Sequence, residues 1–157
     1  MYKRQTESWS QIAVANGKVF IADSAQLRGA GSGADAGKEV IYDQSTSLSP
    51  GVRWISTDET SGFHDLSVGR IPNPRGIVAV GGYLYVTSAH AVWRVNQTTG
   101  VTKKVISGAR FKDLMGITYA NGALYAADSQ TVFGPFVSGI AVATSDTPGV
   151  IWKITLP

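Results

Sequence analysis

The chain contains no cysteine and only two histidines, and charged residues make up 16% of its 157 positions. Without cysteine, a disulfide framework and thiol chemistry are both excluded. No apolar run approaches the length of a membrane-spanning helix, so we expect no membrane span. The low charge and the many Gly, Ser and Thr residues favour a secreted or periplasmic protein.

Basic residues exceed acidic residues only slightly. The formal net charge is +3, and it falls to about +1 when Lys3 and Arg4 are left out. The remaining basic residues are scattered, and we interpret their two local clusters, Lys103-Lys104 and Arg110/Lys112, as parts of a solvated outer face. Nucleic acid is therefore not an expected partner.

What the chain does contain is an internal repeat. A fifteen-residue phrase occurs three times without a gap: SQIAVANGKVFIADS at 10–24, RGIVAVGGYLYVTSA at 75–89 and MGITYANGALYAADS at 115–129. Recurring units of this kind are typical of solenoids, propellers and arrays. The repeat therefore predicts an architecture, whereas the function of such a scaffold depends on its loops.

Each copy of the phrase predicts a β-hairpin. A first apolar run is followed by a two-residue break, Asn16-Gly17, Gly81-Gly82 or Asn121-Gly122, and then by a second apolar run. Asn-Gly and Gly-Gly tolerate the positive φ values of a type I′ turn, which joins paired strands. The first strands, at 12–15, 77–80 and 117–120, are nearly all apolar, so we expect inner strands that are buried on both faces.

Further strands follow each hairpin. We expect third strands at 40–42, 92–95 and 151–154, and fourth strands at 52–56 and 102–106. Four antiparallel strands per unit, with the most apolar strand innermost, are typical of a β-propeller blade. We therefore predict an all-β fold, a partial β-propeller of about three four-stranded antiparallel blades. A meander or sandwich of unrelated hairpins is the alternative.

The segments PRGIVAVGGYLYV at 74–86 and GITYANGALYAADS at 116–129 resemble the NHL-type repeat and its relatives among six-bladed β-propellers. The resemblance covers roughly residues 10–157. The chain departs from it in two long insertions after the Ala-Asp-Ser segments. Gluconolactonase-like hydrolases and streptogramin-lyase-like enzymes are among these relatives, so the resemblance implies both as possible activities.

The spacing of the repeats divides the chain into three blades. The first covers 6–74 with insertions at 25–38 and 57–74, the second covers 75–114, and the third covers 115–157 with an insertion at 130–148 and no outer strand. Residues 1–5 resemble a translated transposon adapter end from shotgun metagenomic library preparation, and we interpret them as a non-native scar. A closed propeller needs about four to eight blades. We therefore expect the C-terminal part of a larger protein, with further blades supplied in cis or by oligomerisation.

The expected binding face is one end of the blades. In a propeller, the loops between strands two and three share a face with the connections between blades, and this face holds the segments 25–38, 57–74, 107–114 and 130–148. The candidate binding residues on it are Asn73, Arg75, Asp113, Phe133 and Phe136. The two aromatic side chains flank a Gly-Pro turn, where they either anchor a ligand or fold down over the sheet.

The candidate metal ligands are Asn73, Asp113, Asp23 and Asp128. Asn73 and Asp113 precede two inner strands, and their oxygens suit Ca²⁺ or another divalent cation. Asp23 and Asp128 end second strands at matching positions, where the alternative role is a turn in which the carboxylate accepts backbone N–H bonds. No catalytic residue is nominated, because no Ser-His-Asp order, metal-ligand spacing or phosphate loop stands out.

Together these observations favour a binding or interaction scaffold over an enzyme. We expect the long-loop face to recognise a glycan, a peptide or a protein. The resemblance implies the alternatives: part of a metal-dependent gluconolactonase-like hydrolase or streptogramin-lyase-like enzyme, or part of a quinone-dependent sugar dehydrogenase in which Arg75 would meet the cofactor.

Overall fold

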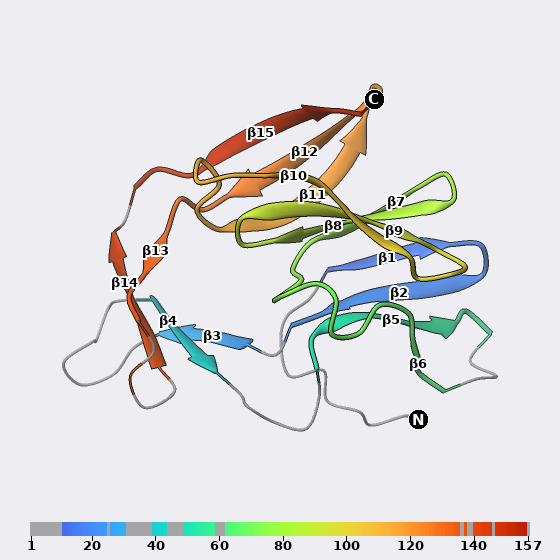
Figure 1. Cartoon of the computed structure of the whole chain (residues 1–157), viewed down its shortest axis with the longest axis horizontal. Coiled ribbons are helices and arrows are strands. Elements are labelled where there is room, and N and C mark those ends of the chain that lie inside the picture. Colours follow the sequence, from blue (N-terminus) through green and yellow to red (C-terminus); the bar gives the residue numbers. More distant parts are fainter. Residues whose placement is uncertain are drawn as a thin grey trace.

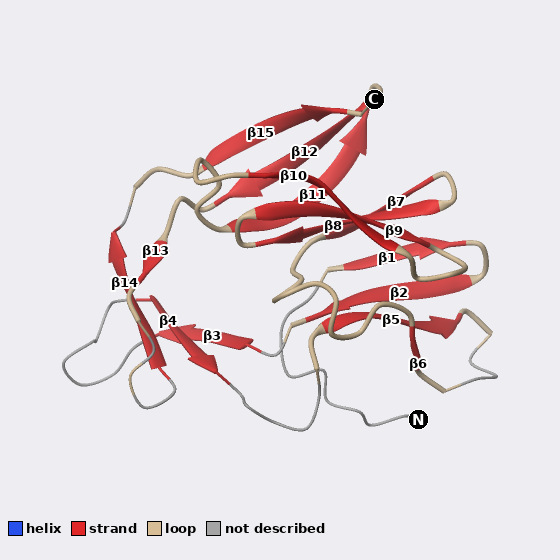
Figure 2. Ribbon diagram, in the orientation of Figure 1, coloured by secondary structure: helices blue, strands red, loops and turns tan. Residues whose placement is uncertain are grey.

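The computed structural model describes residues 11–24, 26–30, 39–43, 49–58, 62–135, 137, 140–145 and 147–156. These residues form strands, turns and loops without a helix, so the prediction of an all-β fold is confirmed (Figures 1 and 2). The described part of the chain accordingly has no helix long and apolar enough to cross a membrane. The strands are β1 (Ile12–Ala15), β2 (Lys18–Asp23), β3 (Gln26–Ala30), β4 (Glu39–Asp43), β5 (Gly51–Ser56), β6 (His64–Asp65), β7 (Ile77–Val80), β8 (Tyr83–Ser88), β9 (Ala91–Asn96), β10 (Thr102–Ser107), β11 (Leu114–Ala120), β12 (Ala123–Asp128), β13 (Val132–Phe133), β14 (Ile140–Ser145) and β15 (Val150–Thr155).

Three antiparallel sheets repeat the same order of strands and form propeller-like blades. Blade 1 is β1-β2-β5-β6, blade 2 is β7-β8-β9-β10, and blade 3 is β11-β12-β15. Strand β7 packs beside both β1 and β11, so the first strand of each repeat lies next to that of the neighbouring blade. The prediction of about three antiparallel blades is confirmed, with three strands in the described part of blade 3.

The hairpin turns follow the predicted chemistry in two of the three copies. Asn16 and Gly17 have φ values of 52° and 70°, and Asn121 and Gly122 have φ values of 49° and 78°, as a type I′ turn requires. In the middle copy only Gly81 has a positive φ, of 58°. A positive φ at the first central residue alone is the pattern of a type II′ turn, so the type I′ prediction was wrong there.

The predicted third strand of blade 1 was wrong. Residues 40–42 belong to β4, whereas the third strand is β5, which pairs with all six residues of β2. The predicted fourth strand at 52–56 is therefore the third, and β6 follows it as the fourth. Val52–Ile55 reads apolar, Arg, Trp, apolar, which is the pattern of the other third strands with the two middle residues exchanged.

The two insertions pair with each other instead of forming separate loops. Strands β3 and β4 come from the connection between β2 and β5, and β13 and β14 come from the connection between β12 and β15. They form a fourth sheet of order β13-β14-β4-β3, joined through β14 and β4. This sheet lies at the end of the blades away from the β1–β2 and β7–β8 turns (Figure 1). It links blade 1 to blade 3, which are not consecutive in sequence.

Two apolar cores hold the blades together. The core between blades 1 and 2 includes Phe20, Ile71 and Leu84, and the core between blades 2 and 3 includes Phe111 and Leu124. All five side chains are fully buried. Burial of large apolar side chains contributes about 1.5–3 kcal/mol each, so these cores are the main stabilising contacts between blades.

The three inner strands are also joined by polar contacts at one repeat position, which is occupied by Gln11, Gly76 and Gly116. The Gln11 side-chain oxygen accepts hydrogen bonds from the backbone N–H of Ile77 at 3.2 Å and of Ile117 at 3.3 Å. Gly76 lies so close to blade 3 that a Cβ would stand 2.8 Å from the nitrogen of Ile117. At Gly116 the nearest atom to a Cβ would be 4.0 Å away.

This difference predicts that two glycines at one repeat position tolerate alanine unequally. Gly76→Ala forces the methyl group into the backbone of blade 3 and is expected to lower the free energy of unfolding by about 3 kcal/mol. Gly116→Ala meets only ordinary contacts and is expected to leave that free energy nearly unchanged. Urea denaturation of both variants measures the difference, and equal losses would contradict the close approach at Gly76.

The sequence predicts that the inner strands are buried on both faces, but this does not hold for every blade. Ala13 of β1 is buried toward blade 2, but Ile12 and Val14 are 57% and 63% exposed. On blade 3, Ile154 is buried toward blade 2, while Ile151 is 67% exposed. The expectation was wrong for β1 because blade 2 covers only one face of blade 1 in the described structure. Each flank of the three-blade stack therefore presents isoleucine or valine to solvent.

These exposed flanks predict self-association of the chain. Exposed apolar sheet surface promotes association, so we expect species larger than a monomer in size-exclusion chromatography with light scattering. Ile12→Lys and Ile151→Lys should each shift the population toward monomer. Val101→Lys, at a loop position that is 62% exposed, is the matched control and should change nothing. A wild-type chain that is monomeric at high concentration would contradict the prediction.

Candidate functional site

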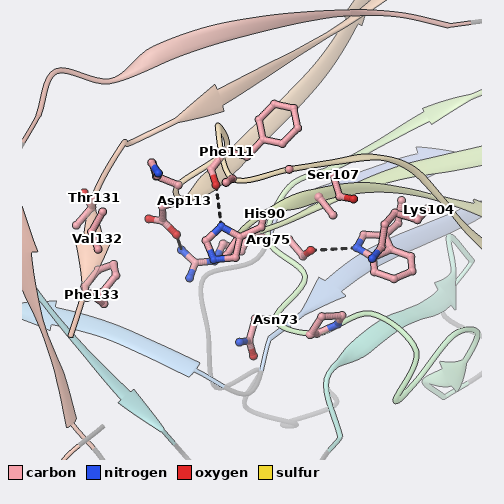
Figure 3. A pocket seen from close by; sticks show the side chains of 18 of the residues that line it. Asn73, Arg75, His90, Lys104, Ser107, Phe111, Asp113, Thr131, Val132 and Phe133 are labelled. Carbon is pink, nitrogen blue, oxygen red and sulfur yellow. Dashed lines mark hydrogen bonds and ion pairs between the residues drawn. The ribbon is translucent and has the colours of Figure 1, made fainter. Parts of the chain in front are cut away.

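A cleft of about 890 Å³ opens at the end of the blades where the fourth sheet lies (Figure 3). Its walls come from the connection before β7, the β8–β9 turn, strands β9 and β10, the connection before β11, and the start of the insertion around β13. These are the connections that the sequence places on the long-loop face. The residues that line it lie at 72–73, 75, 88–91, 93, 104, 107–109, 111–113 and 131–134.

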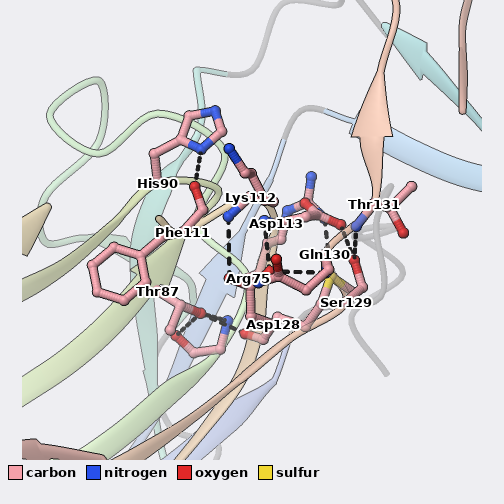
Figure 4. Close-up of polar contacts among 12 residues, drawn as sticks. Arg75, Thr87, His90, Phe111, Lys112, Asp113, Asp128, Ser129, Gln130 and Thr131 are labelled. Carbon is pink, nitrogen blue, oxygen red and sulfur yellow. Dashed lines mark hydrogen bonds and ion pairs between the residues drawn. The ribbon is translucent and has the colours of Figure 1, made fainter. Parts of the chain in front are cut away.

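An ion pair joins Arg75 and Asp113 in the cleft. An Arg75 guanidinium nitrogen (NH1) lies 2.9 Å from an Asp113 oxygen, and the two side chains are 11% and 2% exposed. The Ser129 hydroxyl donates a second hydrogen bond to Asp113, at 2.8 Å. Both charges of the pair are therefore balanced within the protein, and each partner holds the other in place (Figure 4).

Four of the five predicted binding residues line this cleft, and three of them come from the connections between blades. Asn73 and Arg75 come from the connection between blades 1 and 2, and Asp113 comes from the connection between blades 2 and 3. Asn73 has a φ of 45°, a left-handed conformation that is uncommon outside glycine and that asparagine tolerates best. Such backbone geometry is enriched at binding sites.

The structure describes one of the two predicted aromatic residues. Phe133 lies in β13, is half-buried, and lines the cleft. Phe136 lies outside the described residues. The choice between a ligand anchor and a folded-down side chain therefore stays open for both.

His90 lies in the β8–β9 turn and was not nominated from the sequence. Its Nδ1 is 2.7 Å from the backbone carbonyl of Phe111. A carbonyl only accepts hydrogen bonds, so we assign a proton to Nδ1. The signal that sequence reasoning missed is position, because every turn between strands two and three reaches this end of the blade.

Basic residues also contribute to the cleft. Lys104 and Lys112 line it, and both side chains are exposed, as expected for a solvated face. Arg110 lies outside the lining and stacks its guanidinium over the rings of Phe111 and Trp152, at 4.8 and 5.4 Å from their centroids. The excess of lysine leaves the cleft with more positive than negative charge.

Asp128, a candidate metal ligand, uses its carboxylate for structural hydrogen bonds. The backbone N–H groups of Lys112, Asp113 and Gln130 and the indole N–H of Trp152 donate to it, at 2.9–3.1 Å. Burial alone would raise the pKa of Asp128, but these hydrogen bonds outweigh burial and hold the pKa below its ordinary value. Four donors fill the acceptor positions of one carboxylate, which matches the alternative turn-forming role.

Asp23 occupies the matching place in blade 1. Arg53 of β5 forms ion pairs with Asp23 and with Asp65, the latter at 3.0 Å. At the same place in blade 2, Ser88 accepts a hydrogen bond from the indole N–H of Trp93 at 3.0 Å. All three blades therefore join the end of the second strand to the third strand through one polar contact. In the described residues, no group of three His, Asp or Glu side chains is arranged to hold a metal ion.

His64 lies in a different environment from the cleft. Its ring stacks on Trp54, with centroids 4.3 Å apart, and the Lys18 ammonium lies 3.9 Å from the centroid of the same indole. These contacts occur at the β5–β6 edge of blade 1. They account for His64 as a surface packing residue.

No family model matches the chain, and no curated protein matches it. Among solved structures, the chain is similar to a chain of a nidogen/laminin complex, with 15% identity and a TM-score of 0.48 over 78% of this chain and 57% of that one. It is also similar to the computationally designed Ika4 protein, with 7% identity and a TM-score of 0.41 over 98% and 96% of the two chains. The chain thus spans little more than half of the nidogen/laminin chain. At these values the similarities assign no function, and membership of the NHL-type family stays a prediction.

The contacts of Asp128 predict a pH-dependent contribution to stability. Asp128→Ala removes the acceptor of four hydrogen bonds and is expected to lower the free energy of unfolding by about 2–3 kcal/mol near neutral pH. Because the folded-state pKa is lowered, this contribution is present above the ordinary Asp pKa of about 3.9 and is lost as pH falls through the folded pKa. Urea denaturation at pH 6, 4 and 3 should show the gap between wild type and variant narrowing toward acid.

The matched control is Ser88→Ala, at the same place in blade 2. It removes one neutral acceptor, so its smaller cost should not change with pH. A gap for Asp128→Ala that stays constant down to pH 3 would show that the carboxylate charge does not carry these bonds.

Proposed function

We propose that the protein is a propeller-like binding scaffold and that the cleft at the long-loop end holds its ligand. One cleft is lined by two inter-blade connections, by the β8–β9 turn and by the fourth sheet. This convergence is the observation that carries the proposal. The cleft volume of about 890 Å³ falls within the range of about 300–1,000 Å³ that is usual for ligand sites. A glycan unit, or a side chain of a peptide or protein partner, fits such a site.

The chemistry of the lining supports binding more than catalysis. Asp113 is the only carboxylate among the described lining residues, and Arg75 and Ser129 already engage it. A metal-dependent hydrolase would need Asp113 to leave that ion pair, and a quinone-dependent enzyme would need Arg75 to do so. Breaking a buried ion pair leaves an uncompensated charge, which is costly. The enzyme alternatives therefore gain no specific support from the cleft.

The wall formed by the insertions suits recognition. Val132 is exposed and Phe133 is half-buried, and both belong to β13 at the edge of the fourth sheet. An apolar wall facing a polar floor offers both contact area and orientation to a ligand. Since the wall belongs to an insertion and not to the repeat, it can change without disturbing the blades.

The proposal predicts that filling the cleft abolishes binding of a small aromatic probe. Gly108 lines the cleft, and a Cβ at this position has no atom within 4 Å, so Gly108→Trp places a large side chain in the cleft without a backbone clash. Titration of wild type with phenol, followed by ¹⁵N–¹H NMR, should shift amide signals of His90, Lys112 and residues 131–134. Gly108→Trp should remove these shifts.

The matched control is Gly82→Trp, in the β7–β8 turn at the other end of the blade. A Cβ there also has no neighbour within 4 Å, so the same tryptophan is added away from the cleft. This variant should bind phenol as wild type does. Shifts that scatter over the surface in wild type, or that survive Gly108→Trp, would refute the cleft as the binding site.

A further inference from the structure

A β-bulge shapes one wall of the cleft. Strand β10 pairs with β9 so that Lys104 faces Trp93, Ile106 faces Val92 and Ser107 faces Ala91, and the register shifts between Lys104 and Ile106. Val105 is therefore an extra residue without an opposite partner. An extra residue of this kind bends the strand and changes which side chains share a face.

The bulge puts Lys104 and Ser107 on the same face of blade 2. Ala91 and Trp93 are two positions apart on β9, so they point to one face, and their partners on β10 point with them. In a regular strand, residues three apart point to opposite faces. All four side chains line the cleft, so the shared face is the one that forms its wall.

The same bulge places two adjacent apolar residues of β10 against the core. Val105 and Ile106 are adjacent in sequence, yet both pack against the core between blades 2 and 3. One irregularity thus serves the core on one side and the cleft on the other. Bulges are enriched beside functional sites because they re-aim side chains in this way.

Lys104 is held over an aromatic ring, and no carboxylate of the described residues neutralises it. Its ammonium lies 4.9 Å from the ring centroid of Trp93, whose indole N–H is fixed on the Ser88 hydroxyl. Figure 3 shows Lys104 and Ser107 toward one end of the cleft and Asp113 toward the other. Asp113 is the one carboxylate among the described lining residues, and it is paired with Arg75, so the Lys104 charge is available to a ligand.

We propose that Lys104 and Ser107, positioned by the bulge at Val105, bind the carboxylate group of the ligand. This inference rests on the proposed function of the cleft. One ammonium and one hydroxyl supply hydrogen-bond donors and a single positive charge, which matches a monoanionic carboxylate better than a doubly charged phosphate. The apolar part of the ligand lies along the rest of the cleft, toward β13.

A matched pair of probes tests the carboxylate preference. The compounds 3-phenylpropionate and 3-phenylpropionamide share a ring and a chain and differ in charge. Isothermal titration of the wild-type chain should give the acid an affinity about fivefold higher than the amide, as expected for a solvent-accessible charge contact. The difference should shrink as salt is raised, because an exposed ion pair is screened.

Variants of β10 locate the contact. Lys104→Ala should reduce the affinity for the acid to that for the amide, and Ser107→Ala should reduce it by about twofold. Lys103→Ala is the control, because Lys103 carries the same charge but does not line the cleft. Lys103 lies opposite Arg94 in the strand register, on the other face of the sheet. It should leave both affinities unchanged, which separates a local contact from the net charge of the protein.

The outcomes distinguish this inference from the proposed function. If acid and amide bind equally, or if Lys103→Ala weakens the acid as much as Lys104→Ala does, the carboxylate site is wrong and the cleft remains a binding site. If phenol and both phenylpropionyl probes fail to bind wild type at millimolar concentration, the proposed function and the carboxylate site are both overturned.

Discussion

The close approach of the three inner strands at Gln11, Gly76 and Gly116 is the constraint on which the rest of the structure depends. The Gln11 side chain bridges the backbones of β7 and β11, and the buried Thr87 hydroxyl lies between Gly76 and the Met115 carbonyl. These contacts satisfy backbone groups that burial would otherwise leave unpaired. These contacts also fix the distance between the blades. The positions of the connections that end beside the contacts are therefore fixed as well. Arg75 directly precedes Gly76, and Asp113 directly precedes β11, so the ion pair at the base of the cleft follows from this arrangement.

The fourth sheet adds a second constraint at the same end of the molecule. Its strands come from blade 1 and blade 3, and they pair across the end of blade 2 through β14 and β4. Pairing of segments about a hundred residues apart closes a long loop, which costs entropy that the sheet must offset. In return, the edge strand β13 stands beside the blade connections and completes the wall of the cleft. The repeat thus supplies one side of the cleft, and sequence outside the repeat supplies the wall at β13.

Sequence reasoning predicted the features that depend on local residue patterns. The hairpins follow from Asn-Gly and Gly-Gly breaks, and the blades and the end on which long connections gather follow from the repeat. It failed where pairing is non-local. Residues 40–42 have the composition of a third strand. The third strand is the segment that pairs with β2, however, and composition alone does not show whether 40–42 or 51–56 does so. The bulge at Val105 was equally hidden, because Lys-Lys-Val-Ile gives no alternation from which a register shift can be read. The Trp and basic residues of Val52–Ile55, in exchanged order, were the available signal for β5.

The distribution of charge among the described lining residues supports the proposal that the cleft holds a ligand. Asp113, the one carboxylate among the described lining residues, is buried and bound by Arg75 and Ser129. His90 donates an Nδ1–H hydrogen bond to the backbone carbonyl of Phe111, which fixes the orientation of the ring. What is left is positive charge from lysine and an apolar wall. A site with donors to spare and few acceptors selects ligands by their charge. The electrostatics of the described lining therefore support the proposed recognition of a negatively charged ligand.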